Sequence, residues 1–253
     1  MSDLSWAAWA VMALAAFGIG ISKTGLPGIG ILSILMTASV IPAKASTGLL
    51  LPMLILGDVF AVTFYRRHAV WRHLVRLIPC AIAGVIVGWI ALERVNDRQL
   101  RPIIGAIVLA MIALNWWRMR HMGGDIRVPR GWWFPVLMGL AAGVTTMMAN
   151  AAGPIMVIYL LAMRLPKSEF IGTGAWYFLL VNLFKVPFSA SLALINPASL
   201  WFNLVLAPLV ILGALAGMRV ARHIPEQAFN VAVQILAVAA GLYLLIPQGA
   251  FSR

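Results

Sequence analysis

The sequence predicts an all-α polytopic membrane protein, with about ten hydrophobic helices in two inverted five-segment repeats. Of the 253 residues, 62% are hydrophobic and 10% are charged, whereas soluble domains are roughly 45–50% apolar and about 25% charged. Several apolar runs reach the roughly 20 residues that a helix needs to cross a bilayer. Two shorter runs each follow a polar break marked by glycine and proline, which predicts a broken or re-entrant helix pair in each repeat.

The hydrophobic segments follow one another along the whole chain. In order, we expect them at residues 4–22, 28–41, 45–65, 73–92, 99–119, 131–148, 152–163, 168–190, 199–219 and 227–247. The second and seventh are too short to cross a bilayer alone. They follow breaks that run from Ser22 to Gly30 and from Thr145 to Pro154. A broken backbone is tolerated at membrane depth only where protein or a water-filled cavity surrounds it, so we expect the breaks to line a solute site.

The second half of the chain repeats features of the first. Three pairs of residues stand 124 positions apart: Pro42 with Pro166, Gly48 with Gly172, and Asp58 with Asn182. Two Gly-x-x-x-Gly runs, at 84–88 and 213–217, match at an offset of 129 and are expected to let helices pack closely. Five segments per repeat is an odd number, so the second repeat enters the membrane from the opposite face.

These repeats divide the chain. We expect a first membrane repeat at 1–122, a basic cytoplasmic linker at 123–130 and a second membrane repeat at 131–253. The net charge is +12, and the arginines stand at the ends of apolar runs. Most basic residues then fall on the face opposite residue 1, which the positive-inside rule makes cytoplasmic, with both termini outside. This distribution explains the charge without nucleic acid as a partner.

Lys23 is the charged residue of the first break. It stands beside a helix start at Pro27 to Gly30, and helix N-termini offer unpaired N–H groups and a positive dipole end, which suit anions. A lysine at a helix end can instead extend its ammonium to the membrane interface, and this alternative stays open. Our candidates for substrate binding in the first break are Lys23, Thr24, Gly25, Pro27, Gly28 and Gly30.

The second break supplies Asn150, Gly153 and Pro154 but no lysine. We therefore expect a neutral half-site there, with the positive charge coming mainly from the first break. Thr47 and Thr173 lie near polar helix starts and are further binding candidates, with a purely structural role as the alternative.

Asp58 is the only carboxylate well inside an apolar run. A buried aspartate can carry a proton or pair with Lys23 or Lys185. Asp58, its repeat mate Asn182, and Lys185 are therefore our coupling candidates. The alternatives are a structural contact between helices for Asp58 and Asn182, and an ammonium at the outer interface for Lys185. The four histidines stand in basic segments, where we expect them to be solvated: His68, His73, His121 and His223.

Several absent motifs count against other classes of protein. The chain has no Gly-x-x-x-x-Gly-Lys-Ser/Thr phosphate loop and no His-Glu-x-x-His motif. An intramembrane serine or metal protease would need histidine within the apolar segments. We therefore expect no enzyme, no cofactor and no metal site.

Two pairs of motifs resemble a known family. GISKTGLPGIG at 20–30, followed by IPAKASTG at 41–48, resembles the TauE/SafE family of probable membrane transporter proteins. NAAGP at 150–154 and LPKSE at 165–169 look like the second repeat of that family. The resemblance implies a multi-pass carrier in a bacterial inner membrane, tied to export of sulfite, sulfonates such as sulfoacetate, or other small organic anions.

The leading hypothesis is therefore a secondary transporter of a small anion. It would work by alternating access around a site between the two repeats, with the lipid bilayer as its surroundings and proton coupling through Asp58. A passive channel for small solutes is the second hypothesis, and a membrane scaffold or enzyme subunit without transport is the third. The sequence leaves open whether the chain forms a homo-oligomer.

Overall fold

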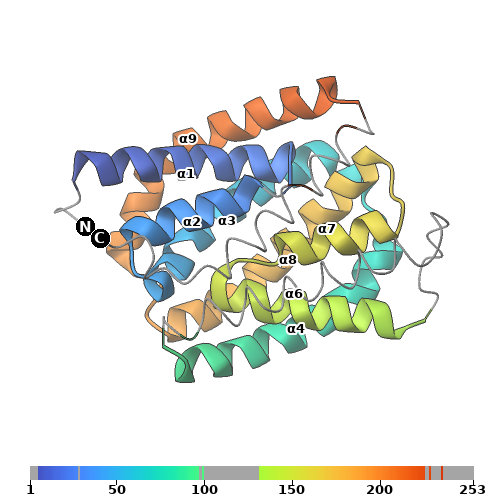
Figure 1. Ribbon diagram of the computed structural model, residues 1–253, viewed down its shortest axis with the longest axis horizontal. Helices are drawn as coiled ribbons and strands as arrows, with labels where there is room; N and C mark the ends of the chain where they lie inside the picture. Colours follow the sequence, from blue (N-terminus) through green and yellow to red (C-terminus); the bar gives the residue numbers. More distant parts are fainter. Residues whose placement is uncertain are drawn as a thin grey trace.

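The structure is a computed structural model that describes residues 5–27, 29–96 and 131–225, with the single positions 99, 228 and 235. The helices in these ranges run alongside one another in a bundle (Figure 1). The expected segments at 99–119 and 227–247 are almost wholly outside the described residues. Gly28 and the linker at 123–130 are outside them as well.

The described elements agree with eight of the expected segments to within a few residues. They are α1 (Trp6–Thr24), α2 (Ile29–Val40), α3 (Ala43–Tyr65), the 3-10 turn η1 (Arg66–His68), α4 (Trp71–Arg94), α6 (Trp133–Ala149), α7 (Gly153–Ala162), α8 (Lys167–Ser191) and α9 (Pro197–His223).

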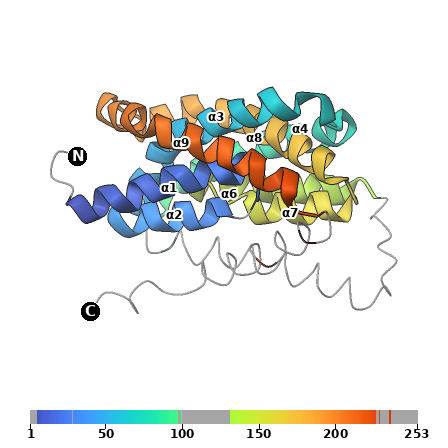
Figure 2. The ribbon, with the colours of Figure 1, turned by 90° about the horizontal axis from the view of Figure 1, so that it is seen from above.

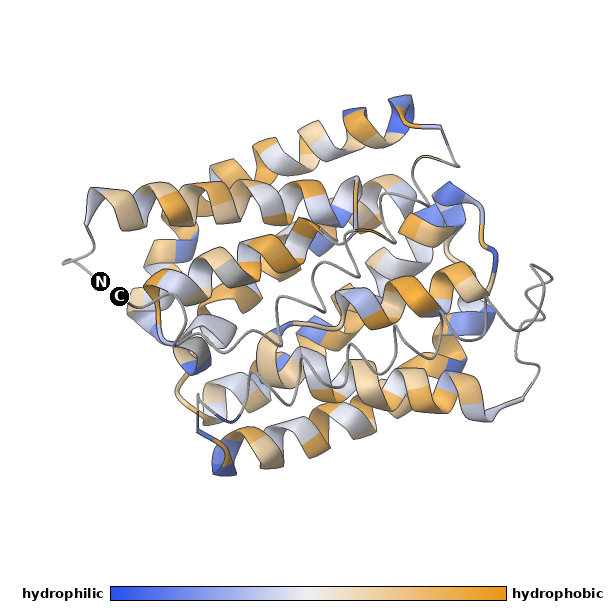
Figure 3. Ribbon diagram, viewed as in Figure 1, coloured by the Kyte–Doolittle hydropathy of each residue, from blue (hydrophilic) through white to orange (hydrophobic). Residues whose placement is uncertain are grey.

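Five of these helices are long and apolar enough to cross a membrane: α1, α3, α4, α8 and α9. Their hydrophilic residues gather towards the helix ends, and apolar residues cover their lengths (Figure 3). By contrast, α2 has 12 residues and α7 has 10. At about 1.5 Å per residue neither spans a hydrocarbon core of about 30 Å, as expected for these two segments.

The two Gly-x-x-x-Gly runs hold pairs of helices in close contact. Along the bundle, α4 packs against α6, and α1 packs against α9. A methyl group on Gly84 of α4 would overlap the backbone of Leu140 in α6, and one on Gly213 of α9 would overlap the backbone of Phe17 in α1. The expected close-packing role of these glycines is confirmed.

Both expected breaks separate one helix from the next. The first lies between Thr24, where α1 ends, and Ile29, where α2 begins. In the second, α6 ends at Ala149 and is followed by the capping residue Asn150, which has a left-handed φ of 55° and donates its N–H to the Thr146 carbonyl. Asparagine tolerates this conformation better than most residues. Pro154 occupies the first turn of α7, where its missing N–H costs nothing.

The short helices begin inside the bundle. Two views show α2 and α7 roughly end to end, with α3 and α8 on the opposite side of the bundle (Figures 1 and 2). The start of each short helix faces the middle of the molecule, next to the crossing of α3 and α8.

Basic residues share one end of the bundle. Lys167, at the start of α8, donates from Nζ to the carbonyl of Ile224 at 2.8 Å, just beyond α9. Thr173 Oγ1 accepts a hydrogen bond from the N–H of Val70, before α4, at 2.9 Å. The start of α8, the end of α9 and the corner between α3 and α4 therefore lie together. This end carries Arg66, Arg67, Arg72, Arg164, Lys167, Arg219 and Arg222.

Candidate functional site

A cavity lies where the two breaks meet. Its lining includes Lys23, Pro27 and Gly30 from the first break, and Asn150, Gly153 and Pro154 from the second. The space that the centres of water molecules can occupy in it is about 70 Å³, several times the roughly 10–15 Å³ that one water needs. The cavity is therefore large enough for a small solute.

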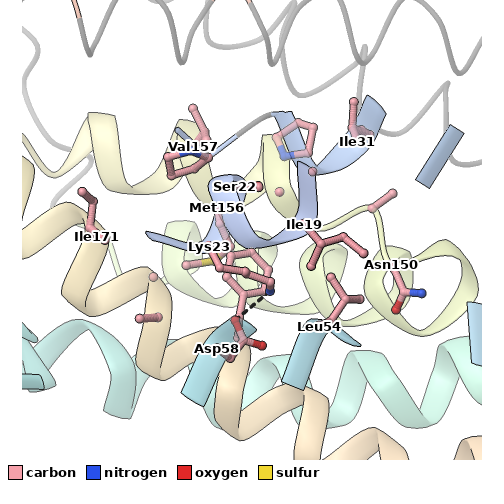
Figure 4. A pocket seen from close by; sticks show the side chains of 18 of the residues that line it. Ile19, Ser22, Lys23, Ile31, Leu54, Asp58, Asn150, Met156, Val157 and Ile171 are labelled. Carbon is pink, nitrogen blue, oxygen red and sulfur yellow. Dashed lines mark ion pairs between the residues drawn. The ribbon is translucent and has the colours of Figure 1, made fainter. Parts of the chain in front are cut away.

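Lys23 and Asp58 form an ion pair in this cavity (Figure 4). The distance from Lys23 Nζ to Asp58 Oδ1 is 2.7 Å, and the two side chains are 10% and 0% exposed. The same ammonium lies 4.3 Å from the ring centroid of Phe178 in α8, a favourable cation–π distance. Lys23 thus turns into the bundle and does not extend to the membrane interface.

A chain of hydrogen bonds continues from this ion pair to the second break. Asn182 donates from Nδ2 to Asp58 Oδ2 at 2.7 Å. Lys185 then donates from Nζ to three oxygens: Asn182 Oδ1 at 3.4 Å, Asn150 Oδ1 at 2.6 Å and Thr146 Oγ1 at 3.2 Å. The polar groups of both breaks are therefore joined through α3 and α8.

The position of Lys185 corrects two expectations. Its side chain is only 1% exposed, so the alternative of an ammonium at the outer interface is wrong. The second break is also not a neutral half-site, because Lys185 brings a positive charge to Asn150. This lysine comes from α8 and not from the break itself. Its signal was the i, i+3 spacing from Asn182, which places both residues on one face of a helix.

Four of the residues predicted to bind substrate do not line the cavity. Thr24 donates from Oγ1 to the carbonyl of Ala214 in α9 at 2.6 Å, and Gly25 packs against the α9 backbone at Gly217. The backbone carbonyl of Thr47 accepts a hydrogen bond from Asn150 Nδ2 at 2.9 Å. Thr173 binds the N–H before α4, as described above. These residues hold helices together, which is the structural alternative considered for Thr47 and Thr173.

Most of the cavity wall is apolar, and the sequence analysis did not single it out. Its members come from five helices, α1, α2, α3, α7 and α8, and they include Ile19, Ile31, Ile34, Leu54, Met156, Val157, Leu160, Phe170, Ile171 and Phe178. Apolar residues are so common in this chain that nothing in the sequence distinguishes those facing a cavity from those facing lipid. Ser22 adds a hydroxyl to the lining.

The backbone at the start of α7 is open to the cavity. A methyl group placed on Gly153 would meet no atom within 4 Å. Gly30, in the first turn of α2, lines the cavity as well. The N-terminal ends of both short helices therefore face the same space, where their dipoles add positive potential.

His73 lies away from this cavity and differs from its predicted role. It is buried in the first turn of α4, with Nδ1 2.9 Å from the hydroxyl of Tyr159 in α7. The expectation that His73 is solvated is wrong, because the basic segment around it folds into the start of α4 and packs against the bundle.

Comparison with known proteins now identifies the family. The model of the family described as "Sulfite exporter TauE/SafE" matches residues 12–244. The chain belongs to the TauE/SafE family. It is 29% identical over 180 residues to the "Probable inner membrane transporter protein TsaS" of Comamonas testosteroni, an alignment that covers 70% of this chain and 73% of that protein. No solved structure matches.

The family assignment confirms the resemblance drawn from the sequence motifs. Together with five helices long enough to span a bilayer, it makes this TauE/SafE chain a multi-pass transporter protein of the inner membrane. The cavity between the two breaks is its candidate solute site.

The ion pair allows a direct test of how far the bundle depends on it. Lys23→Met or Asp58→Asn alone leaves a buried charge without its partner, and we expect each to lower the free energy of unfolding by about 3–5 kcal/mol. The double variant should lose less than the sum of the two. Unfolding of the purified protein in detergent, followed by circular dichroism, measures this coupling.

Thr63→Val is a matched control, because Thr63 is an exposed residue of α3 whose hydroxyl bonds only within its own helix. It should change stability little. Additive effects of Lys23→Met and Asp58→Asn would mean that the ion pair does not contribute to the fold.

Proposed function

We propose that this TauE/SafE protein is a secondary transporter that exports a small anion, namely sulfite, a sulfonate or a related organic anion. In this proposal the anion binds between the two breaks, transport proceeds by alternating access, and Asp58 couples it to protons. The observation that carries the proposal is the cavity at the meeting of the breaks, together with the chain of hydrogen-bonded side chains beside it, which contains two lysines and one aspartate.

Charge favours an anion over a cation. Lys23 and Lys185 outnumber Asp58, the only acidic residue among the buried side chains described. The N-terminal ends of α2 and α7 add positive potential on the same side. Because apolar side chains surround these groups, water screens them poorly, and their attraction for a negative solute is stronger than at a surface.

The size of the cavity and the comparisons support a small substrate. About 70 Å³ open to water centres suits an ion of a few heavy atoms. The family description names sulfite export, and the Comamonas relative is called a probable inner membrane transporter. We take sulfite and small sulfonates as the first solutes to test.

The packing supports two inverted repeats, with boundaries at 1–122, 123–130 and 131–253. If α1 corresponds to α6 and α4 to α9, then the contact of α4 with α6 corresponds to that of α9 with α1, and both are extensive. The repeat mates Asp58 and Asn182 touch each other at 2.7 Å, as equivalent residues do near a two-fold axis. Rocking of one repeat against the other around this contact would open the cavity to each side in turn.

The basic end of the bundle is proposed to face the cytoplasm, with both termini in the periplasm. Single cysteines in a Cys80→Ser background test this orientation, because His68 and Ala198 are exposed near opposite ends of the bundle. A thiol reagent that cannot cross membranes should label Ala198→Cys in intact spheroplasts. It should label His68→Cys only after permeabilisation, and the reverse pattern would invert the topology.

Replacing Lys23 tests the proposed transport. In proteoliposomes, the parental protein should carry sulfite or methanesulfonate with saturation, which a passive channel would not show. Lys23→Met removes a positive charge and leaves Asp58 unpaired beside the cavity, so we expect flux to fall by about tenfold or more. Arg94→Met, an exposed charge at the end of α4, should keep parental flux. Parental flux in a folded Lys23→Met protein would remove Lys23 from the site.

Asp58 is tested through the proton gradient. Asp58→Asn cannot bind and release a proton, so anion flux through this variant should no longer respond to an imposed pH gradient. Glu169→Gln, which changes a carboxylate in the first turn of α8 away from the cavity, should keep the parental response. If Asp58→Asn transports with an unchanged dependence on the gradient, the coupling group lies elsewhere.

A further inference from the structure

The ammonium of Lys185 has hydrogen-bond partners but no counter-ion among the described residues. Its three N–H donors match three oxygens, and all three belong to neutral side chains: Thr146, Asn150 and Asn182. Asp58 does not serve as the counter-ion of Lys185. One of its oxygens binds Lys23, and the other accepts from Asn182.

Such a charge is costly to bury. Lysine is almost never fully buried unless it is paired, and cations at membrane depth normally face a partner or a water-filled cavity. With Lys23 and Asp58 balanced against each other, the polar chain carries one unbalanced positive charge, at Lys185.

An anion in the cavity could balance the charge of Lys185 from the side of Asn150. Asn150 Oδ1 is 2.6 Å from Lys185 Nζ, and Asn150 itself lines the cavity. The other lysine of the cavity, Lys23, already has its charge balanced by Asp58. An anion at the Asn150 side of the cavity would therefore meet an uncompensated cation behind a single amide group, without breaking any ion pair.

We propose that Lys185 is the counter-charge of the transported anion, and that the site selects solutes with one negative charge over those with two. This inference rests on the proposed anion transport and refines it. It assigns the unbalanced charge of the site to Lys185, acting across Asn150, and leaves Lys23 the task of neutralising Asp58. A monovalent anion completes the charge balance, whereas a divalent anion leaves a buried negative charge uncompensated.

Variants that change the net charge of Lys23, Asp58 and Lys185 in different ways can test this assignment. Lys185→Gln removes the unbalanced charge, while its amide can still donate to Asn150. Lys23→Met/Asp58→Asn removes the ion pair as a unit and leaves the net charge, and Lys185, in place. Asp58→Asn alone raises the surplus from one positive charge to two. If Lys23 were the main anion ligand, the double variant would lose binding instead.

The measurement is isothermal titration of purified, monodisperse protein in detergent at pH 7, with methanesulfonate as the monovalent probe and sulfate as the divalent one. The parental protein should bind methanesulfonate more tightly than sulfate. Lys185→Gln should weaken methanesulfonate binding by about tenfold or more. Lys23→Met/Asp58→Asn should weaken methanesulfonate binding less than Lys185→Gln does, and Asp58→Asn should shift the preference towards sulfate. Arg94→Met, which changes an exposed charge at the end of α4, should bind methanesulfonate as the parent does.

Two results would overturn the assignment of the counter-charge to Lys185: unchanged methanesulfonate binding by Lys185→Gln, or loss of binding by a folded Lys23→Met/Asp58→Asn protein. A parental protein that binds sulfate more tightly than methanesulfonate would overturn the proposed preference for solutes with one negative charge. If Lys185→Gln does not fold, the double variant still decides between the two lysines, and Lys185→Met provides a neutral side chain of similar length. A parental protein that binds neither probe and transports neither sulfite nor methanesulfonate would contradict the proposed function itself.

Discussion

Buried charge that must be compensated without bulk water organises the middle of this protein. Three charged residues lie where a bilayer would surround the bundle: Lys23, Asp58 and Lys185. Each one binds a side chain that lies outside its own helix. The carboxylate of Asp58 shares its two oxygens between α1 and α8, and Lys185 connects α8 to the second break. The geometry of the cavity depends on these contacts, because moving any one helix would leave a charge without its partner.

Close packing by glycine makes this arrangement compatible with two broken helices. A break removes helical hydrogen bonds at membrane depth, so the surrounding helices must shield the exposed backbone. Here α1 and α6, the helices that precede the breaks, are pressed against α9 and α4 through the glycines at 213, 217, 84 and 88. The long helices provide a rigid frame, and the short helices α2 and α7 can then begin at a cavity.

Much of this architecture could be predicted from local sequence. Apolar runs of membrane-spanning length, the two polar breaks and the Gly-x-x-x-Gly spacing each express a constraint on consecutive residues, and the described helices follow them closely. Lys23, Asn150 and Gly153 were found as cavity residues for the same reason, since they stand in or beside the breaks. Thr24 and Gly25 were assigned to the site because they also stand in a break, but their side of the helix faces α9.

The sequence by itself determined the membrane class, the helical segments, the breaks and the family, because these depend on composition and on short-range patterns. Only the tertiary structure decided which buried charges meet. Whether Lys23 faces Asp58 or the membrane interface, and whether Lys185 serves the second break, depends on how α1, α3, α6 and α8 cross. The residues concerned are 35 or 39 positions apart in the chain, so no local pattern records their contact. A lysine ammonium at membrane depth takes whatever oxygen partner the packing brings within reach.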